Sequence, residues 1–439
     1  MGTDPLAPLD LAFWNMESAR HPMHMGALGV FAEGAPGAAR HAAELLATRA
    51  AAVPGLRMRI RDVTVPLGGA AREPSAHFDP AEHVRLADPV PDFHPAAGHA
   101  MGRPLDRTKP PWEALVLPSA ADDSSFAVLF KFHHALADGM RALTLAAGMM
   151  DPTTEERPPR ATGPGPRPAP AAGAAPLAER LWGAAAELTR ALDIGAAVAR
   201  ATWDVRSSPA LTARPTGTRR TAGALLDLDD VHRIRKTAGG TVNDVVLALV
   251  AGALRRWLDG RGDGDDRVRP RALVPVSRRR SRTGHPHGNR LSGYLLRLPV
   301  DEGDPLARLR AVRTAMDRNK EAGPQRGAGA VALLADHLPA LGHRVGGPVV
   351  AQAARLLFDI LVTSVPLPSL GLRLGGCPLT EVYPLAPLAH GQSVAVAVST
   401  YRGGVHIGLV ADALAVPDLD ALAAAFGAEL SSLREATAV

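Results

Sequence analysis

Cysteine is nearly absent from this 439-residue sequence, since Cys377 is the single one. One thiol excludes an internal disulfide and a cysteine-built zinc site, and the Gly-Gly-Cys-Pro context of Cys377 predicts a turn rather than a nucleophile. No apolar run of eighteen uncharged residues occurs, which argues against a spanning helix. The opening MGTDPLAPLD lacks the basic and then apolar order of a signal peptide, so we expect a cytoplasmic protein.

Aromatic residues are also scarce, at 4% of the chain, although the formal net charge is +5. Nucleic-acid binding needs a basic surface with interleaved aromatics or a recognisable module, so we expect no nucleic-acid partner. Basic residues bunch in residues 267–282 (RVRPRALVPVSRRRSR). This bunch is either a solvated face or a patch for an anionic ligand, such as the phosphates of coenzyme A or an anionic membrane surface.

The pattern of apolar residues and turn signals divides the chain into three parts. Residues 1–150 alternate helical and strand patterns and predict an α/β lobe. Residues 151–213 begin as a Pro/Gly/Ala linker and continue, at 177–205, with apolar residues at helical spacing. That helical segment is either packed on the lobe or in contact with a membrane or lipid droplet. Residues 214–439 predict a second lobe of strands and helices, with a buried helix that starts at Thr241.

The most informative stretch follows a strand-like alternation at residues 125–132 (SFAVLFKF), whose inner face would be Phe126, Val128, Phe130 and Phe132. Directly after it comes His133-His134-Ala-Leu-Ala-Asp138-Gly139. Histidine can accept and return a proton near neutral pH, so a histidine pair at a strand end indicates a general base. Gly139 is expected to supply the backbone freedom of a turn.

Other chemistries fit this stretch less well. A G-x-S-x-G nucleophile elbow is missing, which disfavours a triad hydrolase. His133, His134 and Asp138 offer metal ligands, but no H-E-x-x-H pair or Cys/His set completes a shell, so we expect no metal. For Asp138 we favour a bracing role, paired with an arginine, over general acid catalysis.

At these residues the sequence resembles the coenzyme A-dependent acyltransferase superfamily, whose signature is HHxxxDG. Further phrases resemble the bacterial wax ester synthase/diacylglycerol acyltransferase (WS/DGAT) family. These phrases span nearly the whole chain: PLAPLDLAFW, RPLDRTKPPWE (103–113), NDVVLALVAGALRRWL (243–258), PVSRR with a following GN (275–289), and YPLAP (383–387).

This resemblance implies an α/β fold of two chloramphenicol-acetyltransferase-like lobes. Each lobe would be a mixed sheet with flanking helices, and a tunnel would run between the lobes. His134 would be the general base, and Asp138 would be salt-bridged to an arginine, for which Arg57 and Arg59 are candidates.

Four further residues are expected along the tunnel: Asn243, Asp244, Asn289 and Ser364. For Asn243 and Asp244, a place in the first turn of a helix is an equally good interpretation. One departure stands out, because the family carries an Asn-Val-Pro-Gly-Pro loop where this chain has Ser364-Val365-Pro366-Leu367-Pro368. A stiffer, more apolar loop implies a different acceptor or acyl pocket.

The resulting hypothesis is an acyl-CoA-dependent O-acyltransferase that uses a long-chain alcohol or diacylglycerol, needs no cofactor beyond the acyl-CoA co-substrate, and has possible peripheral contact with the inner membrane face. Three alternatives stay open. The acceptor could be the hydroxyl or amine of a specialised metabolite. The donor could be an acyl carrier protein. The chain could also be a non-catalytic relative that only binds lipid.

Overall fold

The structure, a computed structural model, describes residues 4–64, 68–152, 210–263, 269–277, 291–322, 358–367 and 371–438. The segment expected at 177–205, nearly all of the linker, the arginines of the basic bunch beyond position 277, and Asn289 lie outside these residues.

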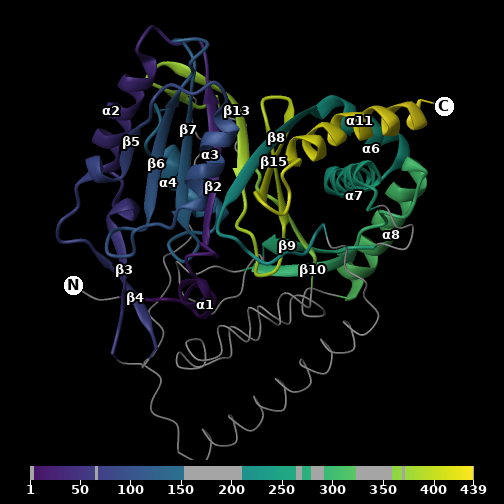
Figure 1. Ribbon diagram of the computed structural model, residues 1–439, viewed down its shortest axis with the longest axis horizontal. Helices are drawn as coiled ribbons and strands as arrows, with labels where there is room; N and C mark the ends of the chain where they lie inside the picture. Colours follow the sequence, from purple (N-terminus) through teal and green to yellow (C-terminus); the bar gives the residue numbers. More distant parts are fainter. Residues whose placement is uncertain are drawn as a thin grey trace, which may run out of the picture.

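The first lobe is built on a six-stranded sheet with the strand order β12-β13-β2-β7-β6-β5 (Figure 1). Only the β5–β6 pair is parallel within this sheet. The strands are β2 (His24–Phe31), β5 (Val84–Leu86), β6 (Trp112–Pro118), β7 (Phe126–His133), β12 (Arg373–Leu374) and β13 (Cys377–Leu385).

Strand β7 lies in the middle of this sheet and leads to the histidine pair. Its even-numbered side chains, from Phe126 to Phe132, form one face as expected and pack in a core with three helices. Its other face, with Ala127 and Leu129, packs in a separate core. Because both faces are covered, all eight residues of β7 are buried, and the strand holds the histidines on a rigid base.

The first lobe also contains four helices, a small three-stranded sheet in the order β1-β4-β3, and two 3-10 turns. Their bounds are α1 (Pro8–Met16), α2 (Ala38–Ala50), α3 (Phe93–Gly102), α4 (Gly139–Ala147), β1 (Asp4–Pro5), β3 (Met58–Asp62), β4 (Ala70–Pro74), η1 (Pro54–Arg57) and η2 (Pro80–Glu82). Helices α1, α2 and α4 contribute to the core on the even face of β7.

The second lobe is built on a six-stranded sheet with the order β10-β9-β11-β14-β15-β8, in which β11 is parallel to both of its neighbours. Four helices share the large core on one face of it. The elements are β8 (Arg219–Asp227), β9 (Arg271–Ser277), β10 (Leu291–Arg297), β11 (Ile360–Ser364), β14 (Val394–Tyr401), β15 (Gly404–Asp412), α6 (Leu228–Ala238), α7 (Val242–Arg261), α8 (Pro305–Ala322) and α11 (Leu419–Thr437).

One feature departs from a simple division at residue 214. Strands β12 and β13 come from the second half of the sequence but complete the first sheet, where Tyr383 pairs with Leu28 of β2. Figure 1 shows β13 between β2 and the strands of the second lobe. The reason is an apolar core along this seam, to which β13 contributes Tyr383 and Leu385 and β15 contributes Val410. Two strands of the segment 214–439, which was expected to form the second lobe, therefore belong to the sheet of the first lobe.

The crossing of β13 over β15 is very close. A Cβ atom on Gly408 of β15 would lie 1.9 Å from the carbonyl oxygen of Pro384, so only glycine fits there.

None of the described helices is by itself long and apolar enough to cross a membrane. Only α6 and α7 taken together have the length and apolar composition of a membrane span, and they are bent by 103° relative to each other.

Candidate active site

The histidine pair lies where β7 ends and the loop to α4 begins. The main-chain N–H of His133 donates to the carbonyl of Pro111 at 2.9 Å, and that of His134 donates to the carbonyl of Met23 at 2.8 Å. The loop is thereby tied to the chain ahead of both neighbouring strands, β6 and β2, which fixes the start of the loop.

His134 is partly exposed, whereas His133 is fully buried. The ring of Phe13, from α1, stacks on the His134 ring with centroids 4.2 Å apart. Burial lowers the pKa of His134 to about 4, although a hydrogen bond to its own main chain acts in the opposite direction. His134 is therefore a neutral imidazole at neutral pH, and one of its ring nitrogens carries an electron pair that can accept a proton.

The two ring nitrogens of His134 differ in their surroundings. Nδ1 is buried, close to the main chain of the residue itself, so Nε2, the nitrogen farther from the backbone, is the better placed of the two to meet a substrate.

His133 is held by contacts that the sequence did not indicate. Its Nδ1 accepts the N–H of Ala135 at 3.0 Å, so its proton is on Nε2, and Nε2 lies 3.3 Å from a carboxylate oxygen of Glu17. The angle of this second contact falls short of hydrogen-bond geometry, so we treat it as an electrostatic contact. Burial raises the pKa of Glu17, but His133 and the N–H of Met23 outweigh it, and the net shift is downward. Glu17 is therefore an ionised carboxylate facing His133.

Asp138 braces the loop, but by a different contact from the one expected. It is the N-cap of α4, and its carboxylate accepts the N–H of Arg141 at 2.8 Å. Within the described ranges it forms no ion pair with an arginine. Gly139 is then the first helical residue, and its φ is not positive, so the expected turn at Gly139 is wrong.

Arg72 of β4, rather than Arg57 or Arg59, is the arginine that contacts the histidine loop, and it does so without pairing with Asp138. Arg57 is exposed in the 3-10 turn η1, and Arg59 pairs with Glu73. Arg72 is buried and donates to Asp10 at 2.6 Å and to the carbonyl of Ala135, also at 2.6 Å. It thus links α1 directly to the histidine loop.

The residues expected along a tunnel are dispersed. Asp244 forms a capping box with Thr241 at the start of α7, as in the helical interpretation, and Asn243 lies in the same turn. Ser364 ends β11, and the next residue, Val365, lies against the histidine loop, because a Cβ atom on Gly139 would be 3.4 Å from its Cγ2. The departing 364–368 loop therefore begins beside α4 and the histidines.

Two further groups bear on the chemistry of this region. Cys377 is buried at the start of β13, and burial raises the pKa of its thiol, which makes it a poor nucleophile. Among the described residues, no group of three or more His, Cys, Asp or Glu side chains could hold a metal ion.

Comparison with known proteins identifies the family of this chain. Residues 6–246 match the model of the wax ester synthase/diacylglycerol acyltransferase catalytic domain, and residues 287–434 match the WS/DGAT C-terminal domain. The chain belongs to this family. A probable diacylglycerol O-acyltransferase of Mycobacterium tuberculosis is 31% identical over 99% of this chain and 100% of its own. A second one from that organism is 31% identical over 84% of this chain and 82% of its own.

Solved structures support the same assignment. A wax ester synthase/diacylglycerol acyltransferase from Marinobacter aquaeolei VT8 aligns with a TM-score of 0.72 at 25% identity, over 99% of this chain and 100% of the other. A trichothecene 15-O-acetyltransferase from Fusarium sporotrichioides shares the fold, with a TM-score of 0.64 at 10% identity over 98% and 94%. This WS/DGAT family member is therefore an acyltransferase with an alcohol acceptor, on the two-lobed α/β fold that the sequence predicted.

Proposed function

We propose that the enzyme transfers an acyl chain from acyl-CoA to the hydroxyl group of a diacylglycerol or a long-chain alcohol, with His134 as the general base. The observation that carries this proposal is the state of His134, a neutral and partly exposed imidazole at the end of a rigid strand. The names of the mycobacterial relatives support diacylglycerol as an acceptor, and the family description supports a wax-forming alcohol as well.

The reaction follows from the protonation state of this ring. Nε2 of His134 removes the proton of the acceptor hydroxyl while the oxygen attacks the thioester carbonyl. A C–O bond forms, the tetrahedral intermediate collapses with cleavage of the C–S bond, and the thiolate of coenzyme A takes the same proton back from Nε2. The products are an ester and free coenzyme A, so the proton balance closes on one nitrogen.

The neighbours of His134 give this step its geometry. Phe13 covers one face of the ring, so the imidazole cannot tilt toward α1. Arg72 holds the next residue of the loop through its carbonyl. A base that is held in place before the substrate binds loses little entropy in the transition state.

The acceptor side is where this enzyme is expected to differ from its family. Val365 lies against Gly139, and Leu367 packs on the core of the first lobe. The described part of this segment, 364–367, therefore begins beside the start of α4, and its apolar side chains support selection of an apolar acceptor. The polar groups of a specialised metabolite would find no hydrogen-bond partners on the side chains of Val365 and Leu367.

Replacement of His134 by alanine tests the proposal. We expect ester formation, followed by release of free thiol and by mass spectrometry of the product, to fall by a factor on the order of 10²–10⁴. The matched control is His77→Ala, because His77 is an exposed histidine of the same lobe. Unchanged turnover in the His134 variant, with circular dichroism like that of the wild type, would refute the role of His134.

The same assay separates the alternatives for the substrates. A panel of diacylglycerol, long-chain alcohol and long-chain amine identifies the acceptor, and acyl-CoA against an acyl carrier protein identifies the donor. If thiol is released from the acyl carrier protein but not from acyl-CoA, the donor is the carrier protein and not acyl-CoA. Acyl-CoA binding without any thiol release would instead indicate a lipid-binding relative.

We further propose peripheral contact with a membrane. The support is the formal charge of +5 and the helical spacing of apolar residues in 177–205. Co-sedimentation with vesicles of anionic lipid, compared with neutral vesicles, tests this contact. Recovery of all the protein in the supernatant with both kinds of vesicle would exclude it.

A further inference from the structure

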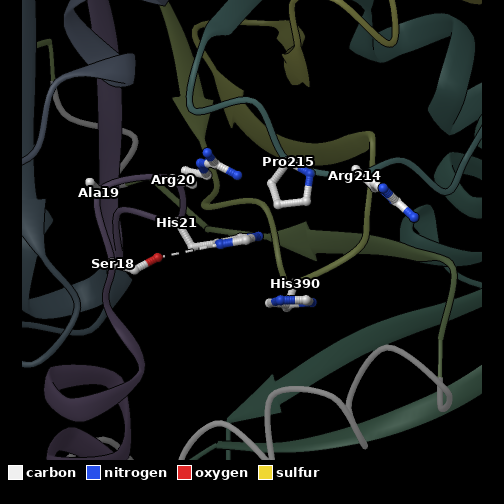
Figure 2. A pocket seen from close by; sticks show the side chains of 7 residues that line it. All are labelled: Ser18, Ala19, Arg20, His21, Arg214, Pro215 and His390. Carbon is white, nitrogen blue, oxygen red and sulfur yellow. Dashed lines mark hydrogen bonds between the residues drawn. The ribbon is translucent and has the colours of Figure 1, made fainter.

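A pocket of about 490 Å³ opens where the two lobes meet (Figure 2). The first lobe contributes Ser18, Arg20 and His21, and the second contributes Arg214 and His390. None of the described residues that line it is acidic. Two arginines and two histidines therefore line one space, and their side chains are donors that suit an anion.

The two histidines are the buried part of this site. Their rings stack with centroids 4.4 Å apart and an angle of 14° between the planes. His21 is only 6% exposed, and in the described part of the chain neither its Nε2 nor Nδ1 of His390 has a hydrogen-bond partner. An unpartnered buried polar atom is costly, so these nitrogens indicate a ligand that completes their hydrogen bonds.

The orientation of the His21 proton suits an anionic ligand. The hydroxyl of Ser18 lies 3.5 Å from Nδ1 of His21 and can donate to it, which leaves the proton on Nε2. Figure 2 shows the His21 ring above His390, with Arg20 next to it and Arg214 farther off, beyond Pro215. Nε2 then offers an N–H to the pocket, as the arginines do.

The carboxylate of Asp412, whose charge acts on His21, is held by other partners. Asp412 accepts the N–H of Thr216 at 2.8 Å and its hydroxyl at 2.9 Å, and lies 3.7 Å from Arg219. Arg219 in turn donates to the carbonyl of Arg20 and so holds the main chain of the pocket in place. The side chains of Arg20 and Arg214 remain exposed, so their charge is available to a ligand.

The pocket is close to the histidine loop along the chain. Glu17, which faces His133, precedes Ser18, and Met23, which accepts the N–H of His134, is two residues from His21. Two extended residues span about 7 Å at most. A ligand anchored here by an anionic group can therefore extend to His134.

We propose that this pocket binds a phosphate group of the acyl-CoA donor. The inference rests on the proposed function, because the donor itself is part of that proposal. Phosphate oxygens match the fork of donors on arginine and the N–H of a neutral imidazole. Free inorganic phosphate shares this chemistry, so the experiment has to separate the two sources.

The test compares two thioester donors, acyl-CoA and acyl-pantetheine, which carries the same reactive group without any phosphate. The variant is Arg20→Gln/Arg214→Gln, and both arginines are exposed, so the fold should tolerate the change. We expect the ratio of kcat/KM for acyl-CoA to that for acyl-pantetheine to fall about tenfold or more. Inorganic phosphate should compete with acyl-CoA in the wild type and lose this effect in the variant.

The matched control is Arg40→Gln/Arg318→Gln, which removes the same charge from exposed positions on α2 and α8 and should leave the ratio unchanged. An unchanged ratio in the pocket variant overturns the proposal while the enzyme remains an acyltransferase. Binding of inorganic phosphate that does not compete with acyl-CoA also overturns it. If the wild type uses neither donor, the proposed function itself is wrong.

Discussion

The link between α1 and the histidine loop predicts a large effect for one substitution, Arg72→Met. Arg72 and Asp10 are both nearly inaccessible to solvent, at 3% and 0% exposed. Methionine keeps much of the volume of the side chain but removes the charge and both hydrogen bonds. The carboxylate of Asp10 then loses its cation, and the carbonyl of Ala135 loses its donor.

The size of the effect follows from burial. Removal of one partner from a buried ion pair costs about 3–5 kcal/mol, because the remaining charge stays in a medium of low polarity. This is a large part of the stability of an ordinary domain, about 5–15 kcal/mol. The double variant Arg72→Met/Asp10→Leu should lose less than the sum of the two single changes, by about 2 kcal/mol.

Urea unfolding followed by circular dichroism measures these free energies. The matched control is Arg59→Met on the neighbouring strand β3, since Arg59 pairs with Glu73 but is 38% exposed, and exposed pairs contribute about 0–1 kcal/mol. In the folded Arg72 variant we also expect a loss in kcat on the order of 10- to 100-fold, because the loop that carries His134 shifts. If Arg72→Met unfolds no more easily than Arg59→Met, the link does not stabilise the loop.

Three other outcomes are expected. First, kcat/KM should fall at acid pH with a midpoint near pH 4 rather than 6.5, since His134 stays neutral down to about pH 4. The contribution of neutral His134 to the free energy of unfolding should be full above pH 6.5 and should decline as the pH falls toward 4, which unfolding followed by circular dichroism would measure. Second, Glu17→Gln should lower kcat by about tenfold with little change in KM, because His133 loses the charge that orients it; an altered KM alone would point to substrate binding instead. Third, Gly139→Val should lower activity through a clash with Val365, and Val365→Ala in the same chain should restore part of this activity. If the double variant recovers no activity, contact between these two positions is not the cause of the loss.

Elements with strong local patterns could be predicted from the sequence. The alternation of β7 and the Thr241 cap of α7 depend on neighbouring residues, and both appear where expected. Helix α3 has a weak helical pattern in the sequence, because it contains Pro95 and Gly98. It forms because Asp92 caps it, and because Thr221 of β8 donates to the carbonyl of His94 across the lobe seam.

The candidate site could be predicted only in part, for a similar reason. The histidine pair is contiguous in the sequence, so its place at the end of a strand could be inferred. The partners of the pair come from separate segments: Phe13 and Glu17 from α1 and the residues after it, and Arg72 from β4. Nothing local distinguishes Arg72 from Arg57 or Arg59, because the choice depends on which arginine is buried beside Asp10.

The contribution of β13 to the first sheet affects how the protein can be made. Strand β2 can pair with β13 only after residues 377–385 have left the ribosome, so one edge of β2 stays unpaired for most of synthesis. Contacts between such distant segments also slow folding, which lengthens the time available for aggregation. The first lobe should therefore not be obtainable by truncation after residue 150, whereas co-expression of the two halves could supply the missing strand from a separate chain.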